Sequence, residues 1–471
     1  MLAKLRFLKK PKYTAFFVAV LFGFLIHLFG LITMLHNYDD IAVNPAGFGS
    51  SVQSGRWGLA VLGGIFHLIF GTYNVPFLYG LMFLALLGCS AAMIITMFDV
   101  KSHKNAALIG ALFVVFPTAT STIFFKYTAH YYGVAILLAV WAAKKLVTSK
   151  RGFILGTLFI VLSLSIYQAY LPLTIGLLVL YLLKRVLDDK NATFLRTMQT
   201  GLFFCLSIIT AFILYRLSVE FSVIVGNKIL VLVRQAMPSL VVDDFFLSNY
   251  QGINSMGEMT FSSLLGSIGD AFKSFFTLPL NDYCGLASSA LLKIVYPVFF
   301  LLTGAICGIV LFIKKRKLTH VFAVLLLIAL FPLAVNFIVV MCPNSFIYTL
   351  MVYAFVLVPC APLLLFESWK TAEALPKART AIKRSLAVAS IAMIAIYSFS
   401  TTVNYTYMYY QNRQVENYVS SLVTQIRMTE DFSSDKPWAL VGSINDPLLK
   451  SGWDSTPTYG GNGSSEKMLN S

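Results

Sequence analysis

The chain has 471 residues, of which 58% are hydrophobic and 12% are charged. An ordinary soluble domain has roughly 25% charged residues, so the composition excludes a soluble globular enzyme and an intrinsically disordered protein. The formal net charge is nevertheless +16, and such a basic balance points to nucleic acid or to a membrane surface. The positions of the charges along the chain decide between these two partners.

Long apolar stretches run through most of the sequence. A helix that spans a bilayer needs about 20 mostly apolar residues, and Pro172 disfavours helical geometry at Leu171, which predicts a tight hairpin between two of the stretches. We therefore predict an all-α polytopic membrane protein with about 11 transmembrane helices. In chain order the stretches are 13–35, 75–98, 106–125, 130–147, 153–170, 171–183, 199–217, 288–313, 318–341, 346–366 and 385–408.

The basic residues mark one side of the predicted bundle. Of the 36 Lys and Arg residues, 24 fall in six short segments, whereas 17 of the 20 Asp and Glu residues fall elsewhere. Cytoplasmic loops are enriched in Lys and Arg, so this distribution predicts a cytoplasmic N-terminus and an extracytoplasmic C-terminus. The charge excess is thus explained by the lipid bilayer, and we expect no nucleic-acid partner. The six segments are 1–12, 101–105, 144–151, 184–196, 314–317 and 370–384.

Three segments outside the membrane are long enough to carry function. They are a first loop over 36–72, a second loop over 218–287 and the C-terminal region 409–471. Within the second loop, 218–236 and 261–278 have an amphipathic pattern and are expected to lie on the membrane as a cover. The residues 1–408 would then form the transmembrane domain, and 409–471 an extracytoplasmic tail or a small cap with a strand near 437–442.

The first outside loop contains the acidic pair Asp39 and Asp40, directly after the first span. Adjacent like charges raise one pKa and can leave a carboxylate ready to accept a proton, although a solvated helix end has the same pattern. Arg56 and Trp57 then precede an apolar stretch, 58–71, that is too short to span and is expected to lie in the interface plane. Trp57 would anchor this helix, and Arg56 would face lipid phosphates or a phosphorylated ligand.

Two further polar clusters lie at the outward ends of predicted spans. The cluster 125–132 contains His130 and also Lys126, which is the only Lys or Arg of its short outside loop and would either bind phosphate or snorkel. The second cluster contains Tyr167 and Gln168, which would either hydrogen-bond a sugar or belong to the aromatic belt. His27, which lies within the first span, is expected to be a structural residue.

A known family shares these features in the same order. Asp39-Asp40, Ser54-Gly55-Arg56-Trp57 and Tyr167-Gln168-Ala169-Tyr170-Leu171 resemble the GT-C class of membrane glycosyltransferases, and more specifically the type II Gtr glucosyltransferases. This resemblance implies a GT-C-like fold in a bacterial cytoplasmic membrane, with a catalytic carboxylate in the first outside loop. It also implies a polyprenyl-phosphate glucose donor, and O-antigen or wall polysaccharide as the acceptor.

The chemistry of such a donor sets the requirements of the site. A phosphate monoester has a second pKa of about 6. Because it is this weakly basic, it can leave without a proton from a protein general acid. One base for the acceptor hydroxyl is required, and Asp39 or Asp40 is expected to serve, giving inversion at the anomeric carbon. The cations Arg56 and Lys126 would bind and neutralise the donor phosphate, and His130 is a further candidate to bind it. The side chains expected to contact the sugar or the acceptor are Trp57, Tyr167 and Gln168.

Other ligands and functions have weaker support in the sequence. Two carboxylates beside phosphate oxygens would suit Mg²⁺ or Mn²⁺, but nearby cations can serve instead, so we expect no metal and no cofactor. A polysaccharide polymerase would suit the large second outside loop. A transporter for a lipid-linked sugar or polysaccharide predicts ionisable residues in the middle of spans and paired repeats, and the sequence has few of these features.

Overall fold

The computed structural model describes residues 10–33, 35, 52–149, 151–236, 261–277, 290–342, 347–369, 375–430, 432–433 and 435. These residues form helices joined by turns. Proline stands in the first turn of α1, α4, α6, α9 and α16, where its missing N–H breaks no helical hydrogen bond. The α-helices are α1 (Pro11–Ile32), α3 (Trp57–Phe70), α4 (Pro76–Met97), α5 (His103–Val115), α6 (Pro117–Phe124), α7 (Ala129–Thr148), α8 (Gly152–Ile166), α9 (Leu171–Asp188), α10 (Phe194–Ala236), α11 (Phe261–Thr277), α12 (Ala290–Ile313), α13 (Leu318–Val335), α14 (Ile338–Met341), α15 (Leu357–Leu365) and α16 (Pro376–Arg427).

The regular structure of the described residues is helical, and the protein is a multi-pass membrane protein. Among the described residues, 8 helices are long and apolar enough to span a bilayer, and α5 with α6, which meet at a 42° bend, would form a ninth span. The expected number of about 11 is not confirmed. Of the predicted spans, 153–170 becomes the 15-residue helix α8. The predicted span 346–366 becomes short helical pieces, with Pro362 inside α15.

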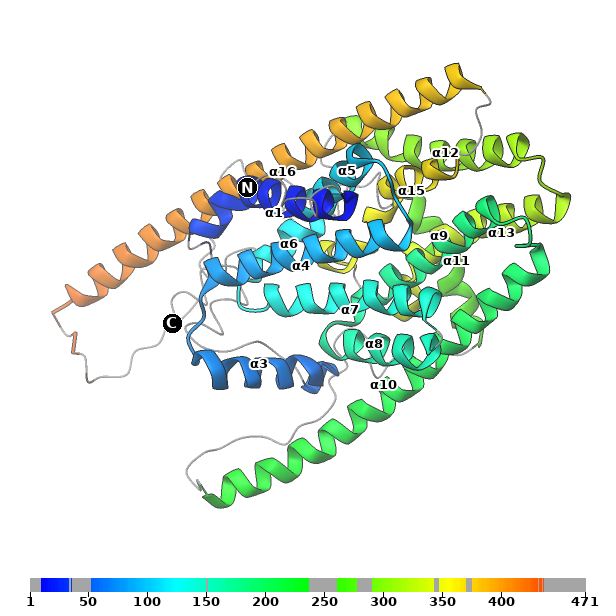
Figure 1. Cartoon of the computed structure of the whole chain (residues 1–471). Helices are drawn as coiled ribbons and strands as arrows, with labels where there is room; N and C mark the ends of the chain where they lie inside the picture. Colours follow the sequence, from blue (N-terminus) through cyan, green and yellow to red (C-terminus); the bar gives the residue numbers. More distant parts are fainter. Residues whose placement is uncertain are drawn as a thin grey trace, which may run out of the picture.

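Four helices from the first half of the chain pack side by side in the order of the sequence. Figure 1 shows α1, α4, α7 and α8 as a row, with α16 along one edge and α10 along the opposite edge. Helix α1 contacts α4 and α5 along a line of small buried residues, Ala15, Ala19 and Gly23. Small residues let helix backbones approach closely within a membrane, so this line fixes the first span in the bundle.

Two helices extend much further than the hydropathy pattern indicates. Helix α10 has 43 residues and α16 has 52, which correspond to roughly 65 and 78 Å at 1.5 Å per residue. The expected surface segment 218–236 is therefore a continuation of α10, and α16 passes without a break through residue 408. The one-turn pair of Arg216 and Glu220, 3.3 Å apart, supports the helical continuation of α10.

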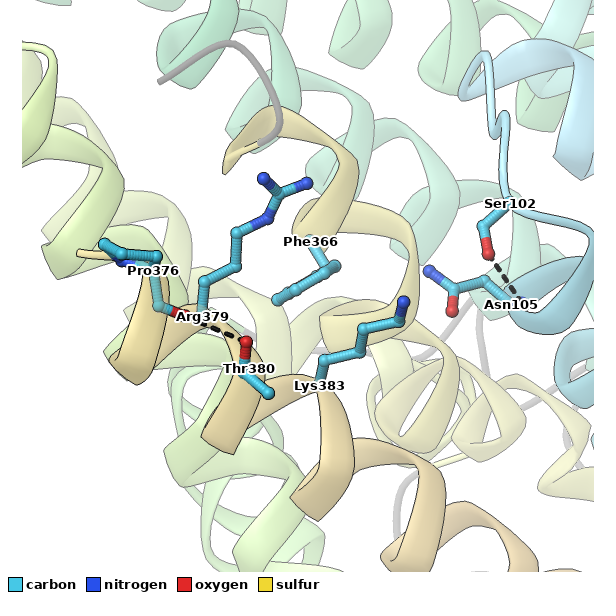
Figure 2. A pocket seen from close by; sticks show the side chains of 7 residues that line it. All are labelled: Ser102, Asn105, Phe366, Pro376, Arg379, Thr380 and Lys383. Atoms are coloured by element: carbon cyan, nitrogen blue, oxygen red, sulfur yellow. Dashed lines mark hydrogen bonds between the residues drawn. The ribbon is translucent and has the colours of Figure 1, made fainter. Parts of the chain in front are cut away.

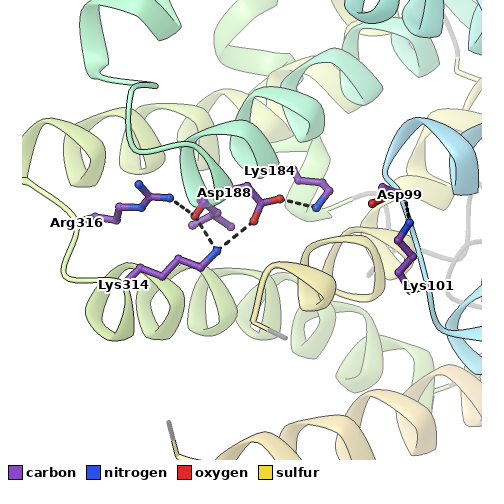
Figure 3. Close-up of polar contacts among 7 residues, drawn as sticks. Asp99, Lys101, Lys184, Asp188, Lys314 and Arg316 are labelled. Carbon is purple, nitrogen blue, oxygen red and sulfur yellow. Dashed lines mark hydrogen bonds and ion pairs between the residues drawn. The ribbon is translucent and has the colours of Figure 1, made fainter. Parts of the chain in front are cut away.

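The basic loops lie together at one end of the bundle. Asp188, at the end of α9, contacts Lys184 at 2.6 Å and Lys314 at 3.2 Å, and Arg316 donates to the carbonyl of Leu187 at 2.7 Å (Figure 3). The segments 184–196 and 314–317 thus meet at this end. Because α7, α8 and α9 alternate in direction, segment 144–151 lies at the same end.

The remaining basic segments meet at this end too. A cavity of about 340 Å³ lies where the start of α5 meets the start of α16, so segments 101–105 and 370–384 are neighbours. Thr14 is 2.7 Å from His103, which places the start of α1 beside them. We call this side the basic end. The cavity is lined by Ser102, Asn105, Phe366, Pro376, Arg379, Thr380 and Lys383 (Figure 2).

Candidate active site

The candidate site lies at the end of the bundle opposite the basic end. The predicted bases Asp39 and Asp40 are outside the described residues, so the site is built from the residues around them in space and sequence. A short 3-10 helix, η2 (Val52–Ser54), leads to Gly55 and α3. Gly55 has φ +70°, a left-handed conformation that glycine adopts without strain, and this turn directs the Arg56 side chain toward α7 and α9.

Arg56 is the cationic centre of the site. Its Nε donates to Oε1 of Gln168 at 3.5 Å, and one terminal nitrogen donates to the hydroxyl of Tyr132 at 3.4 Å. Its guanidinium lies 4.7 Å from the centre of the Tyr167 ring, which is a cation–π contact. Both hydrogen bonds are long for N–H donors, so the Arg56 guanidinium is positioned by several weak contacts rather than by one strong ion pair.

Gln168 joins three parts of the chain. Its amide nitrogen donates to the carbonyl of Ser54 at 2.8 Å and to the hydroxyl of Tyr215 at 2.8 Å. The Tyr215 hydroxyl in turn donates to the carbonyl of Gly55 at 3.1 Å. The turn before α3, the start of α9 and the middle of α10 are therefore connected through a single side chain.

The local backbone explains how Gln168 reaches these partners. Tyr167 has an extended conformation, φ −156° and ψ 116°, which ends α8, and the 3-10 helix η3 (Gln168–Tyr170) leads directly into α9. A tight turn between the two helices is present as predicted, but the expected cause is wrong. Leu171 is helical, with φ −57° and ψ −42°, and Pro172 stands in the first turn of α9, so the chain turns at Tyr167 instead. Because Tyr167 interrupts the α-helical geometry just before Gln168, the Gln168 side chain can point across the bundle toward α3 and α10.

Aromatic rings surround the guanidinium. The Tyr132 and Tyr167 rings are stacked with their centres 4.5 Å apart, and Tyr170 lies edge-on to Tyr167 at 5.2 Å. All three are buried, whereas Arg56 is half-buried. Burial lowers the pKa of Arg56, but the phenol groups, first that of Tyr132, raise it by more. Arg56 is therefore a permanent cation that remains partly accessible.

A hydrogen bond of Trp57 connects α3 with α10. Its indole nitrogen donates to the hydroxyl of Ser218 at 2.9 Å, and that hydroxyl donates to the carbonyl of Tyr215 at 2.6 Å. The expected anchor thus makes a specific contact with protein. The α3 helix itself exposes Val61, Ile65 and Leu68, as expected of a helix that lies in the membrane interface.

Lys126 and His130 occupy a different part of the same end. The Lys126 ammonium donates to the carbonyl of Thr33, just beyond α1, at 2.6 Å. The His130 ring stacks on Tyr79 with centres 4.0 Å apart, and Phe66 lies 4.8 Å away. Among the described residues no hydrogen bond or ring contact connects either side chain with Arg56.

The structure thus brings together Arg56, Tyr167 and Gln168, which the sequence singled out, and adds residues that it did not. Tyr132 belonged to an aromatic cluster already noted, but Tyr215 and Ser218 stand inside a long apolar helix without a recognisable motif. Within the described part of the chain no group of three His, Cys, Asp or Glu residues could hold a metal ion. A permanent cation among hydroxyl and amide groups can bind an anionic oxygen beside a sugar.

Comparison with known proteins gives one match. The family model described as Glucosyl transferase GtrII matches residues 28–359, which is more than half of the chain. The match begins inside α1, ends inside α15 and includes every site residue described above. A search of curated proteins and a search of solved structures each found no match.

Proposed function

The chain belongs to the GtrII family of glucosyl transferases, and from this premise we propose that it moves glucose from a polyprenyl-phosphate donor to a cell-surface polysaccharide. The reaction takes place on the outer side of a bacterial cytoplasmic membrane. The N-terminus lies in the cytoplasm and the C-terminus outside.

The observation that carries this proposal is the contact of Arg56 with Gln168 and Tyr167. Two motifs more than a hundred residues apart meet around one permanent cation. A partly accessible guanidinium suits a phosphate, because it presents several N–H groups in a fixed plane. The amide and the tyrosines around it suit the hydroxyl groups of a sugar. Trp57 is a further candidate for the sugar or acceptor, since it follows Arg56 directly.

The position of the basic end indicates on which side of the membrane the site lies. Helix α7 begins beside Tyr132 and ends at Lys144 and Lys145, so the site and the basic loops lie at opposite ends of the same helices. Lys and Arg concentrate on the cytoplasmic side, which supports an extracytoplasmic site. A donor whose lipid tail lies in the bilayer can present its phosphate at this level.

The reaction needs one base and one good leaving group. The acceptor oxygen attacks the anomeric carbon while the bond from that carbon to the phosphate oxygen breaks, and the configuration inverts. The acceptor proton goes to Asp39 or Asp40, and the electron pair leaves with the polyprenyl phosphate. Arg56 stabilises the charge that develops on this phosphate.

Lys126 and His130 are further candidates for the donor phosphate. Lys126 holds the carbonyl of Thr33, at the start of the segment that leads to Asp39, so it can connect the base and the leaving group. Both ring nitrogens of His130 are buried without a hydrogen-bond partner among the described residues, and a ligand oxygen would satisfy one of them.

The experiment combines purified protein, synthetic polyprenyl-phosphate glucose and isolated O-antigen or wall polysaccharide. We expect glucose transfer that falls by about 10²–10⁴ in Asp39→Asn or Asp40→Asn. The matched control is Asp99→Asn, at the basic end beside Lys101, which should retain full activity. Undiminished transfer in both Asp39→Asn and Asp40→Asn would exclude these bases. Long polymer products would indicate a polymerase, and movement of the labelled lipid across vesicles without transfer would indicate a transporter.

A further inference from the structure

A groove at the basic end lies outside the machinery described above. A cavity of about 560 Å³ opens between α1, α4 and α7. Lys12 and Lys144 line it, and its walls continue to Phe16, Met93 and Leu137. Leu137 is seven residues before Lys144 on α7, so the groove runs roughly 10 Å along the helices.

The groove opens toward lipid. Helix α1 exposes Phe17, Leu21 and Leu25 at 39%, 63% and 66%, and this one-turn spacing forms a single apolar face on a membrane-spanning helix. Phe17 also lines the groove, as does Trp141, which is 38% exposed. The occupant of the groove in a membrane is therefore a lipid molecule rather than water.

The charge of the groove favours one kind of lipid. Among the described residues that line it, the two cations come from different helices and none is Asp or Glu. Both lysines are half-buried and stand at the end of the helices where headgroups lie. Each Lys at the surface of an anionic membrane strengthens the attraction about fivefold.

We propose that this groove binds an anionic phospholipid, with its headgroup phosphate between Lys12 and Lys144 and the upper part of one acyl chain against Phe16, Met93 and Leu137. The proposal is independent of the glucosyl donor, whose phosphate lies near Tyr132 at the other end of α7. The lipid would connect α1 and α7 on the cytoplasmic side.

The full chain in vesicles tests this directly, because Trp141 reports on the groove. Trp141 fluorescence, taken as the difference from a Trp141→Phe variant, is measured with brominated phosphatidylglycerol and with brominated phosphatidylcholine. We expect phosphatidylglycerol to compete about 30-fold more strongly for the groove. The double variant Lys12→Gln/Lys144→Gln should lower this preference to nearly one, and Ala92→Phe, which fills the groove, should reduce quenching by both lipids.

The controls separate this site from general surface charge. Lys145→Gln removes the neighbouring cation, which contacts Trp141 but does not line the groove, and should leave the preference intact. Lys12→Arg/Lys144→Arg keeps the charge and should also leave it intact. If the double Gln variant does not fold, the two single variants should each lower the preference about fivefold. Equal quenching by the two lipids, or a preference that survives removal of both lysines, would overturn the proposal.

Discussion

Nε of Arg56 and Oε1 of Gln168 lie 3.5 Å apart, although 112 residues separate them in the chain. Gln168 uses its amide nitrogen for the Ser54 carbonyl and the Tyr215 hydroxyl, so its orientation is fixed from both ends. The position of the cation therefore depends on a side chain that need not touch the reacting atoms. This separation of roles makes the site testable one residue at a time.

Gln168→Ala should lower both stability and activity. The substitution leaves the Ser54 carbonyl and the Tyr215 hydroxyl without this donor, and an unsatisfied buried group costs about 1–3 kcal/mol. It also releases Arg56, so we expect the KM for the donor to rise about tenfold. Gln425→Ala, on the exposed end of α16, is the matched control. Steady-state kinetics and thermal unfolding measure the two effects, and an unchanged KM would contradict the positioning role.

Arg56→Lys and Arg56→Gln separate charge from shape. Lysine keeps the positive charge but loses the planar arrangement of donors, so we expect transfer to fall about tenfold. Glutamine loses both, and we expect a fall of about 10²–10³. Arg413→Gln, at an exposed position paired with Glu416, should remain active. If Arg56→Gln transferred glucose at the original rate, Arg56 would have no part in binding the phosphate.

Much of this fold follows from the sequence, because hydropathy locates most of the apolar helices. His27 is structural as expected: its ring nitrogens lie 2.7 Å from the Tyr405 hydroxyl and 2.8 Å from the Val114 carbonyl. The lengths of α10 and α16 were not predictable, because a helix can continue beyond the bilayer without a change in its backbone hydrogen bonds.

The site was predictable only in part. The motifs supplied Arg56, Trp57, Tyr167 and Gln168, but nothing local to these motifs shows which of them meet in space. Tyr215 is a tyrosine within an apolar helix, where a belt residue has the same appearance. Its role depends on the packing of α10 against the turn before α3, which a hydropathy pattern does not contain.

Trp57 and Ser218 should be energetically coupled. Trp57→Phe removes the donor and Ser218→Ala the acceptor of a hydrogen bond of 2.9 Å. Each should destabilise the protein by about 1 kcal/mol, and the double variant should lose less than the sum, with a coupling of about 0.5–1.5 kcal/mol. Reversible unfolding in mixed micelles provides these values. Strict additivity would show that the contact contributes nothing to holding α3 on α10.

Removal of divalent cations should leave transfer unchanged within about twofold, because permanent cations can neutralise the departing phosphate. The measurement is the initial rate of glucose transfer in EDTA, compared with the rate after Mg²⁺ or Mn²⁺ is restored. A rate that falls more than tenfold in EDTA and recovers with either metal would mean that Asp39 and Asp40 hold an ion, and the assignment of a carboxylate base would then have to change.

Two glycines of α3 provide a matched test of how closely this helix must approach α8. A Cβ added at Gly58 would lie 2.1 Å from Oγ of Ser165 and 3.1 Å from its carbonyl carbon, whereas a Cβ at Gly64 would meet nothing within 4 Å. Gly58→Ala should therefore force α3 outward at a cost of about 1–3 kcal/mol, and it should lower transfer at least tenfold because Arg56 directly precedes this helix. Gly64→Ala makes the same chemical change in the same helix and should stabilise it by up to about 1 kcal/mol with full activity. Equal activity of the two variants would show that the contact between α3 and α8 does not position the cation.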